Sequence, residues 1–530
     1  MSGPLDILLV NACILDGTGA PAIKASVGIK NNIIAFIGDD RPSASDIINV
    51  EGLVLCPGFI DTHGHSEFSV LAAPECMSKL YQGITTEING NCGLSAAPLA
   101  GEAKERREAD LDEFNITERW STFDEYFEIL RKRSPFINFA TLTGHGNIRA
   151  SVKGYSDGRS TKDEVIEMSG MLNDTILKGS LGLSTGLIYP PGVFTDREEL
   201  VALIKGIRSA KDLVYATHMR SEGDLLIESI EEVISICRSS GIKAHISHLK
   251  TGGRDNWHKV YEAISSVDKA INEGLDITFD RYPYTGAATD LDIMLPSWAY
   301  EGGNERELER ISDKASRKKI IDHIRSIYKD ENEYGSVIIS SVTNDKNRWM
   351  EGEDLLSISG RVKKSPWDAV LDLLVEENLR VGAIYMSMSE DNLRKFLSHP
   401  KCMIGSDSAV RNYSGITAKG KPHPRGFGSM PRFLGKYVRD EALMGLEEGI
   451  RRITSFPAET FGLAGRGMIK EGYYADITVF DQKTVIDKAT YKEPFSRPEG
   501  IHHVIINGKI SVFDGELIPD SGHGIIIKAK

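Results

Sequence analysis

Two histidines follow an apolar stretch early in the chain and have the spacing of paired metal ligands. The apolar run reaches a Pro-Gly pair at 57–58, and His63 and His65 stand two residues apart shortly after it. Side chains two residues apart on a strand point to the same side, and two imidazoles at a strand end are suited to a metal ion. This stretch therefore predicts one edge of a metal site, provided that other strand ends supply further ligands.

Further metal-type side chains stand at the ends of other apolar segments. Each has an ordinary reading, since a free cysteine is usually a small buried side chain and an aspartate between two serines can cap a helix. Because such residues recur at one strand end after another, we expect them to share one metal site rather than to have separate structural roles. These residues are Cys92, His218, His248 and Asp407.

One of these segments carries two histidines, His245 and His248. Their odd spacing places them on opposite faces of a strand, so only one of them can face a pocket. His248 stands at the strand end before a polar turn. We therefore expect His248, and not His245, to be the ligand.

The segments that must position these residues alternate between strand and helix patterns. Such alternation predicts parallel strands joined by right-handed crossovers, and the number of units favours a (β/α)8 TIM-like barrel, in which functional groups collect at the C-terminal ends of the strands. A break in the spacing predicts an insertion at about 285–397, after the seventh strand, with helices at 306–328 and 365–377. The expected strands include 136–142, 213–217, 243–247, 276–280 and 402–405, and the expected helices include 197–208, 225–239 and 260–272.

Both ends of the chain show the alternation and turns of small β structure. Asn507 and Gly508 form a two-residue hairpin signal between two apolar runs. We expect the two ends to pair into one small β-sandwich. The chain then divides into 1–56 and 466–530 for the sandwich, and 57–465 for the catalytic barrel with its insertion.

Composition restricts the class of protein. The chain has 530 residues, of which 41% are hydrophobic and 26% charged, as in a globular protein. A formal charge of −13 argues against a general nucleic-acid binder, which would carry a basic face. No stretch approaches the roughly 20 apolar residues of a membrane span, and the first residues lack a signal-peptide pattern. We expect a cytoplasmic protein that binds neither nucleic acid nor membrane; whether it forms a homo-oligomer stays open.

Five segments together resemble a known family of enzymes. The segment Pro57–His65 resembles the signature of the amidohydrolase superfamily, although the His-Gly-His pair alone would fit many hydrolases. The other four narrow the resemblance to the D-aminoacylases, or N-acyl-D-amino-acid deacylases, over most of the chain. These four are Asn91–Ser95, Ser247–Lys250, Tyr282–Thr285 and His423–Arg425.

The resemblance implies a zinc enzyme. It places a tightly held Zn²⁺ on Cys92, His218 and His248. It also implies that His63 and His65 line a second metal position, weaker or unused, with Cys92 able to bridge the two. Three protein ligands on the first metal would leave a coordination position open for water or substrate.

The resemblance also implies roles for residues that do not bind the metal. Asp407 would shuttle a proton from water to the leaving amine. The residues that would hold a carboxylate of a small-molecule substrate are Lys250, Tyr282 and Arg425. The chain departs from the family pattern at Ala288, where relatives often have a serine. The resemblance therefore implies that one substrate contact of the family is missing here.

The activity that these features predict is zinc-dependent hydrolysis of N-acyl-D-amino acids to a carboxylate and a free D-amino acid. One alternative is an amidohydrolase that opens a cyclic amide, as hydantoinases and dihydroorotases do. Such enzymes usually bridge two metals with a modified lysine at the fourth strand, and the segment 181–185 of this chain has none. A second alternative is a non-catalytic relative, against which the intact ligand set argues.

Overall fold

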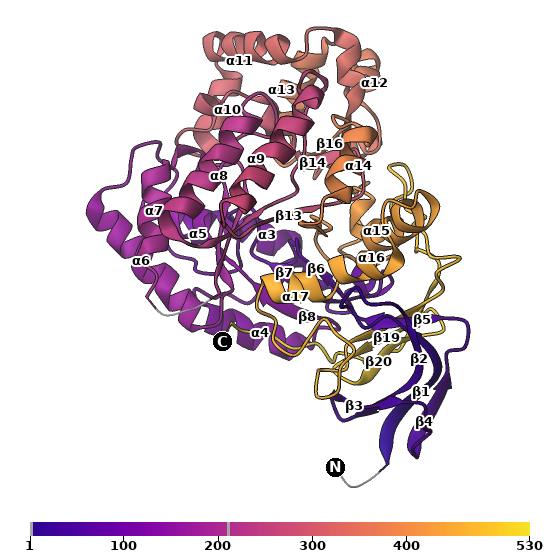
Figure 1. Ribbon diagram of the computed structural model, residues 1–530. Coiled ribbons are helices and arrows are strands. Elements are labelled where there is room, and N and C mark those ends of the chain that lie inside the picture. The colour runs from indigo at the N-terminus through magenta and orange to yellow at the C-terminus, as the bar shows by residue number, and fades with distance from the viewer. Residues whose placement is uncertain (1–3, 209–211, 530) are drawn as a thin grey trace.

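A barrel of eight short parallel strands forms the centre of the molecule (Figure 1). The computed structural model describes residues 4–208 and 212–529. The predicted (β/α)8 barrel is confirmed, and its third strand consists of β8 and β9, separated by one residue. The strands are β6 (Phe59–Asp61), β7 (Ile84–Asn89), β8 (Asn138–Thr141) with β9 (Thr143–Gly144), β10 (Gly182–Gly186), β11 (Val214–His218), β12 (Lys243–Ile246), β13 (Ile277–Arg281) and β17 (Cys402–Ile404).

Parallel pairing runs through β6, β7 and β8, and then from β9 through β10 to β13 and β17. The first and last strands meet just beyond their ends, where Gly64 and Ser408 form a parallel bridge. The backbone N–H of Asp407 donates to the carbonyl of His63 at 2.8 Å. The barrel therefore closes at the two segments that carry the predicted site residues.

Amphipathic helices cover the outside of the barrel. In α8, buried residues such as Ile230, Val233 and Cys237 recur at helical spacing and join the main apolar core with strand residues such as Tyr215 and Ile246. Among the described residues, no helix has both the length and the apolarity to cross a membrane. The principal outer helices are α4 (Phe123–Arg133), α6 (Lys162–Leu177), α7 (Arg197–Lys205), α8 (Leu226–Ser240), α9 (Val260–Asn272), α14 (Glu390–Ser398) and α16 (Leu446–Arg452).

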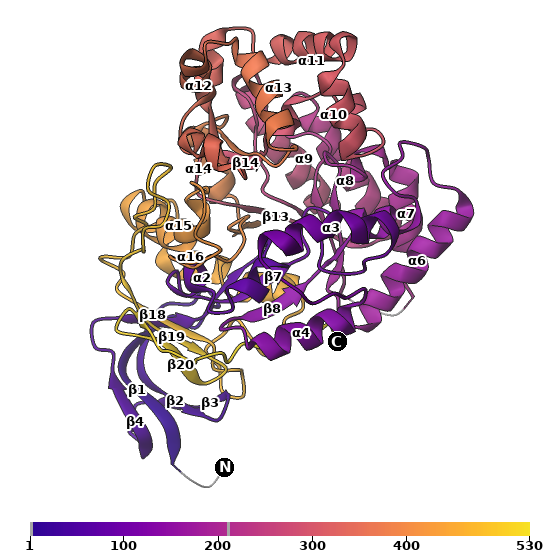
Figure 2. The ribbon, with the colours of Figure 1, turned by 180° about the vertical axis from the view of Figure 1, so that it is seen from behind.

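Strands from both ends of the chain form a separate nine-stranded sheet with its own apolar core. The N-terminal and C-terminal parts join where β5 pairs antiparallel with β18. Asn507 and Gly508 both have positive φ, 48° and 79°, as the predicted hairpin turn requires. Figure 2 shows this sheet below the barrel. Its strands are β1 (Leu5–Ile14), β2 (Ile23–Lys30), β3 (Ile33–Gly38), β4 (Ala44–Asn49), β5 (Val54–Pro57), β18 (Ile477–Phe480), β19 (Ile501–Ile506), β20 (Lys509–Phe513) and β21 (Glu516–Leu517).

The segment between β13 and β17 adds a second layer on the far side of the barrel from the terminal sheet (Figure 1). It has a three-stranded antiparallel sheet and a core of its own. The single helix predicted at 306–328 is wrong, because Asp313 is extended (ψ 126°) and caps a new helix by accepting from the N–H groups of Ala315 and Ser316. The elements are β14 (Ala287–Asp290), α10 (Asn304–Ser312), α11 (Lys314–Ile327), β15 (Val337–Ser341), α12 (Leu355–Val362), α13 (Pro366–Glu376) and β16 (Gly382–Tyr385).

Candidate metal centre and substrate cavity

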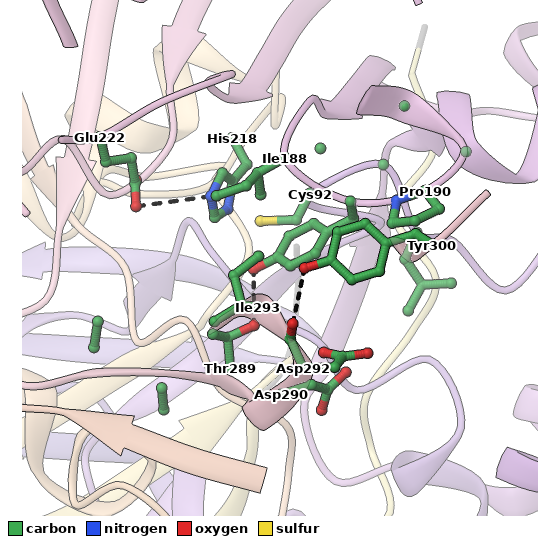
Figure 3. A pocket seen from close by; sticks show the side chains of 18 of the residues that line it. Cys92, Ile188, Pro190, His218, Glu222, Thr289, Asp290, Asp292, Ile293 and Tyr300 are labelled. Atoms are coloured by element: carbon green, nitrogen blue, oxygen red, sulfur yellow. Dashed lines mark hydrogen bonds and ion pairs between the residues drawn. The ribbon is translucent and has the colours of Figure 1, made fainter. Parts of the chain in front are cut away.

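The C-terminal ends of the barrel strands open into a cavity of about 740 Å³. Figure 3 shows Cys92 and His218 on one side of it and Asp290 and Asp292 on another. His63 lies beneath the cavity and is fully buried. The other predicted site residues line the cavity: His65, Cys92, His218, His248, Lys250, Tyr282, Asp407 and Arg425.

Three of these residues have an unusual backbone conformation. The φ angles of Cys92, His248 and Asp407 are 52°, 38° and 49°, in the left-handed region that non-glycine residues rarely adopt. Each follows a strand, so the turn directs the side chain back over the end of the barrel. Such conformations cost about 1–3 kcal/mol each and cluster at functional sites.

Gly64, between His63 and His65, must be a glycine because the side chain of Glu87 packs directly against its α-carbon. A Cβ atom on Gly64 would lie 1.8 Å from Oε1 of Glu87, a buried carboxylate of β7. His63 and His65 can therefore leave the strand end together, with ring centroids 5.2 Å apart, only because no side chain stands between them. Both lie just beyond β6 rather than on it.

Cys92 stands where two groups of potential metal ligands meet. Its Sγ atom lies 3.3 Å from Nε2 of His63 and 3.5 Å from Nε2 of His248. Within each group the ligand atoms all lie within 4.8 Å of one another. The groups that contain Cys92 are His63–His65–Cys92 and Cys92–His218–His248, and a third group is His63–His248–Asp407.

The state of these side chains fits a metal ion. Among the described residues, both ring nitrogens of the buried His218 lack a hydrogen-bond partner, although Oε2 of Glu222 lies 3.7 Å from Nε2. This arrangement is costly unless a ligand uses a nitrogen lone pair. Burial raises the pKa of the Cys92 thiol, but the imidazoles of His63 and His248 outweigh burial and hold that pKa well below its ordinary value. A thiolate beside imidazoles is a donor set typical of zinc.

Glu222 orients His248, one of the potential ligands, from the side away from Cys92. Its Oε1 lies 2.8 Å from Nδ1 of His248, so Nδ1–H donates to the carboxylate and the lone pair of Nε2 faces Cys92. Lys250 also approaches Nδ1, at 2.9 Å, but an ammonium cannot donate to a protonated nitrogen, so Lys250 pairs with Glu222 instead. Burial raises the pKa of Glu222, yet Lys250, His218 and His248 outweigh it and hold that pKa well below its usual range.

Asp280 orients the other side of the centre. One oxygen lies 3.1 Å from Nδ1 of His63 and 2.9 Å from Nε2 of His245, and the other accepts from the backbone N–H of His248 at 2.6 Å. His245 belongs to no converging ligand group of the described residues, and its Nδ1 bonds Thr278 at 2.8 Å. His248, as expected from the sequence, is the histidine that faces the cavity.

Asp407 contacts both a possible metal ligand and a cation. Its Oδ1 lies 3.2 Å from Nε2 of His65 and 3.6 Å from Nε2 of His63, while Oδ2 lies 2.7 Å from Nη1 of Arg425. Burial raises the pKa of Asp407, but Arg425 and His248 outweigh burial and hold that pKa well below its usual range. The carboxylate is therefore ionised at neutral pH and can accept a proton.

Positive side chains converge on Tyr282, whose buried hydroxyl has no hydrogen-bond partner in the described part of the chain. The guanidinium of Arg425 lies over the Tyr282 ring, 4.6 Å from its centroid, and Nη2 of Arg425 donates to the carbonyl of Ala288 at 3.3 Å. Burial raises the pKa of Tyr282, but Lys250 and two arginines outweigh it and lower that pKa. This side of the cavity favours an anion.

A buried lysine joins the two strand ends beneath the metal centre. The ammonium of Lys79 lies 2.7 Å from Asp61, 2.7 Å from the hydroxyl of Ser406 and 2.9 Å from the carbonyl of Ser408. Asp61 precedes the His-Gly-His segment and Ser406 precedes Asp407, so Lys79 holds together the two segments that close the barrel. Sequence reasoning did not identify Lys79, Glu222 or Asp280 as site residues.

A parallel barrel whose C-terminal rim gathers imidazoles, a thiolate and a carboxylate around one cavity defines a metal-dependent hydrolase. Comparison with known proteins gives the family. A family model described as "Amidohydrolase family" matches residues 46–512. A D-aminoacylase of Alcaligenes xylosoxydans xylosoxydans is 33% identical over 508 residues, which cover 96% of this chain and 94% of that protein.

Solved structures agree. An N-acyl-D-glutamate deacylase from Bordetella bronchiseptica, complexed with zinc and a phosphonate inhibitor, has a TM-score of 0.84 at 32% identity, over 99% of this chain and 100% of that one. The chain belongs to the amidohydrolase family, in its D-aminoacylase branch, as the resemblance predicted. A D-hydantoinase from Thermus sp. has a TM-score of 0.57 at 14% identity, over 99% of both chains, a likeness of fold alone.

Proposed function

We propose that this enzyme hydrolyses the amide bond of N-acyl-D-amino acids and uses zinc held by Cys92, His218 and His248. The observation that carries the proposal is the position of Cys92, whose sulfur is shared by two converging ligand groups at the floor of the substrate cavity. Relatives named D-aminoacylase and N-acyl-D-glutamate deacylase support this substrate class.

The donor types favour zinc, and the two groups favour unequal metal positions. Cys92, His218 and His248 supply three protein ligands, the number found in catalytic zinc sites that keep a position open. His63 and His65 complete a second, weaker position that shares Cys92. When bound, zinc supplies Lewis acidity, which polarises the amide carbonyl and makes water a better nucleophile at neutral pH.

Asp407 moves the proton. Its carboxylate accepts a proton from the attacking water and delivers it to the amide nitrogen, which leaves as a free amine. The contacts to His65 and Arg425 orient the two carboxylate oxygens and keep the group ionised before the reaction begins. An amine is a poor leaving group until it is protonated, so this transfer is required for the C–N bond to break.

The substrate carboxylate binds beside Tyr282. Arg425 offers a planar fork suited to a carboxylate, Lys250 offers a second cation, and the unpartnered Tyr282 hydroxyl offers a hydrogen bond. All three line the cavity together with the metal ligands. A carboxylate held there fixes the distance between the α-carbon and the metal centre, which favours linear N-acyl amino acids over neutral amides.

A substrate screen with metal analysis tests the proposal. Purified enzyme is assayed with N-acetyl-D- and N-acetyl-L-amino acids and with hydantoins, and its metal content is measured by mass spectrometry. We expect about one tightly bound zinc per chain and hydrolysis of D-enantiomers. Hydrolysis of hydantoins alone would move the enzyme to the cyclic-amide class, and absence of both zinc and hydrolysis would make it a non-catalytic relative.

A further inference from the structure

The outer end of the substrate cavity carries three carboxylates that the proposed reaction does not use. Asp290 ends β14, Asp292 lies in the short helix η3 (Leu291–Met294), and Glu307 lies in α10; all three line the cavity. Figure 3 shows Asp290 and Asp292 side by side below Tyr300. All of them come from the insertion between β13 and β17.

Glu307 carries a buried carboxylate. Only 4% of the residue is exposed, and its Oε1 accepts no hydrogen bond from any described residue. The backbone carbonyls of Asp290 and Asp292 accept from the hydroxyls of Tyr385 and Tyr300, and neither carboxylate forms an ion pair among the described residues. Glu307 is buried, whereas Asp292 is half-buried and Asp290 is exposed. A buried ionised group is costly unless a cation pairs with it, so the Glu307 carboxylate is arranged to receive positive charge.

The basic residues around the cluster do not neutralise it. Arg107 pairs with Asp110 at 2.8 Å, and Arg310 donates to the carbonyls of Ala299 and Glu301. Arg106 lines the same cavity, but its guanidinium lies over the ring of Tyr155 and forms no ion pair among the described residues. Arg380, which also acts on Asp290, pairs with Glu113. Within the described residues, Arg106 is therefore the guanidinium near the three carboxylates that has no ion-pair partner of its own.

The electrostatics of the cluster agree with this geometry. Burial and the neighbouring carboxylates raise the pKa of Asp292 to about 7 and that of Glu307 to about 8, while Arg106 opposes the shift without cancelling it. The surrounding cavity walls desolvate Asp290 and raise its pKa as well, although its side chain is exposed to the cavity. A cation that entered the cluster would remove this penalty and favour the ionised carboxylates.

Strand β14 connects the cluster to the reaction site. The carbonyl of Ala288 accepts from Arg425, and Thr289 bonds the hydroxyl of Tyr189, whose ring packs 5.0 Å from that of His218. Asp290 comes two residues after Ala288, about 7 Å further along a strand. An extended lysine side chain spans about 6 Å at ordinary bond lengths, so a substrate held at Arg425 can reach the cluster.

An organic cation suits this place better than a metal ion. Among the described residues, the ligand groups that converge within 4.8 Å all lie at the metal centre, and none includes Asp290, Asp292 or Glu307. Tyrosine rings line the same end of the cavity and can contribute cation–π contacts to an ammonium or guanidinium group. These rings belong to Tyr155, Tyr300, Tyr328 and Tyr385.

We propose that Asp290, Asp292 and Glu307 bind a positively charged group at the far end of the substrate, so that the enzyme prefers N-acyl-D-amino acids that carry an ammonium or guanidinium group. This inference rests on the proposed function and adds the substrate class. The cation can be carried by the amino-acid side chain, which extends from the α-carbon on the nitrogen side of the amide. It can equally be carried by the acyl group, which extends from the carbonyl side. A substrate with an acidic side chain would be repelled from the same end.

Matched pairs of substrates test the cluster. N-acetyl-D-arginine is compared with N-acetyl-D-citrulline, which has nearly the same shape without the charge, and with N-acetyl-D-glutamate. A second arm compares N-(4-aminobutanoyl)-D-alanine with N-pentanoyl-D-alanine. We expect kcat/KM to be about tenfold or more higher for the charged member of at least one pair, the effect of a charge-assisted hydrogen bond. The arm that shows the preference identifies which part of the substrate carries the cation.

Variants assign the preference to these residues. Asp292→Asn and Glu307→Gln should each reduce the charged-to-neutral ratio of kcat/KM by several-fold, and Glu307→Lys should raise the rate on N-acetyl-D-glutamate relative to N-acetyl-D-arginine. Glu305→Gln is the matched control, since Glu305 is exposed on the same helix and does not line the cavity. Zinc content is measured for each variant.

The outcomes separate this inference from the proposed function. Hydrolysis of neutral N-acyl-D-amino acids with equal kcat/KM for arginine and citrulline, and for both acyl groups, leaves the proposed function intact and overturns the cationic preference. A charged-to-neutral ratio of kcat/KM that is unchanged in the Asp292→Asn, Glu307→Gln double variant would likewise overturn the cationic preference and leave the proposed function intact. Absence of hydrolysis on every N-acyl-D-amino acid overturns both.

Discussion

Asp407 and Arg425 form a largely buried ion pair, with Oδ2 of the carboxylate 2.7 Å from Nη1 of the guanidinium. The proposed proton carrier and the proposed carboxylate anchor are thus in direct contact. Nη2 of Arg425 makes only a 3.3 Å bond to the carbonyl of Ala288, near the long end of the normal range. A substrate carboxylate can replace that bond at small cost while the pair with Asp407 persists, so substrate binding and positioning of Asp407 are coupled.

The first prediction concerns the metal. Cys92→Ala, His218→Ala and His248→Ala should each remove most of the bound zinc, because each deletes one of the three proposed protein ligands and Cys92→Ala also removes the thiolate among them. His63→Ala should reduce the metal content less. The measurement is metal per chain by mass spectrometry after dialysis against a weak chelator. Cys13→Ala, in the distant strand β1, is the matched control, and full zinc with full activity in Cys92→Ala would contradict the assigned site.

The second prediction concerns Glu222, which contacts the proposed zinc ligand His248 but is not itself proposed to bind the metal. Glu222→Gln removes the charge that pairs with Lys250 and weakens the hydrogen bond that orients Nδ1 of His248. Loss of such an orienting partner typically lowers metal affinity about 10–100-fold. Competition with a fluorescent zinc chelator measures the change.

The control for Glu222 is an exposed carboxylate on the following helix. Glu231→Gln, in α8, should leave zinc affinity at the wild-type value. The variant Glu222→Asp keeps the charge and should recover part of the affinity. Wild-type zinc affinity in Glu222→Gln would mean that His248 is held in place by other contacts.

Sequence patterns predicted the site residues because each stands at or just beyond the end of a strand. Cys92, His218, His248 and Asp407 all follow this rule, and the parallel barrel brings such ends to one face. The orienting residues follow no such rule. Glu222 lies in a turn four residues beyond His218, where a carboxylate is ordinarily a solvated surface group.

The remaining omissions have similar causes. Lys79 contacts Ser406, 327 positions away in the chain, from a four-residue helix without periodicity. Asp280, like Asp407, lies near the end of a strand, and this position could have identified it as a site residue from the sequence. The left-handed backbone of Cys92, His248 and Asp407 could not be anticipated, since turns of this kind usually have glycine. The break at Asp313 was readable from its capping side chain.

The third prediction concerns the stability of the barrel closure. Lys79→Met leaves the carboxylate of Asp61 buried without its cation, and removal of one partner of a buried pair typically costs about 3–5 kcal/mol. The free energy of unfolding, from urea titration monitored by fluorescence, should fall by that order. Lys132→Met, at an exposed position of α4, should change it little. A double variant Lys79→Met, Asp61→Asn should recover part of the loss; equal stability of Lys79→Met and wild type would contradict the role of Lys79.

The last prediction separates proton transfer from substrate binding. Asp407→Asn keeps the shape of the side chain but cannot accept a proton at neutral pH, so kcat should fall by about 10²–10⁴-fold while zinc content and KM change little. Arg425→Ala and Lys250→Ala should mainly raise KM, because they remove charged contacts to the substrate carboxylate. Since Arg425 also contacts Asp407, its variant should lose some kcat as well, whereas Lys250→Ala should not. Zinc content, kcat and KM for an N-acetyl-D-amino acid are measured for all three variants. A zinc-free Asp407→Asn protein would make Asp407 a metal ligand, and near-normal kcat would remove it from proton transfer.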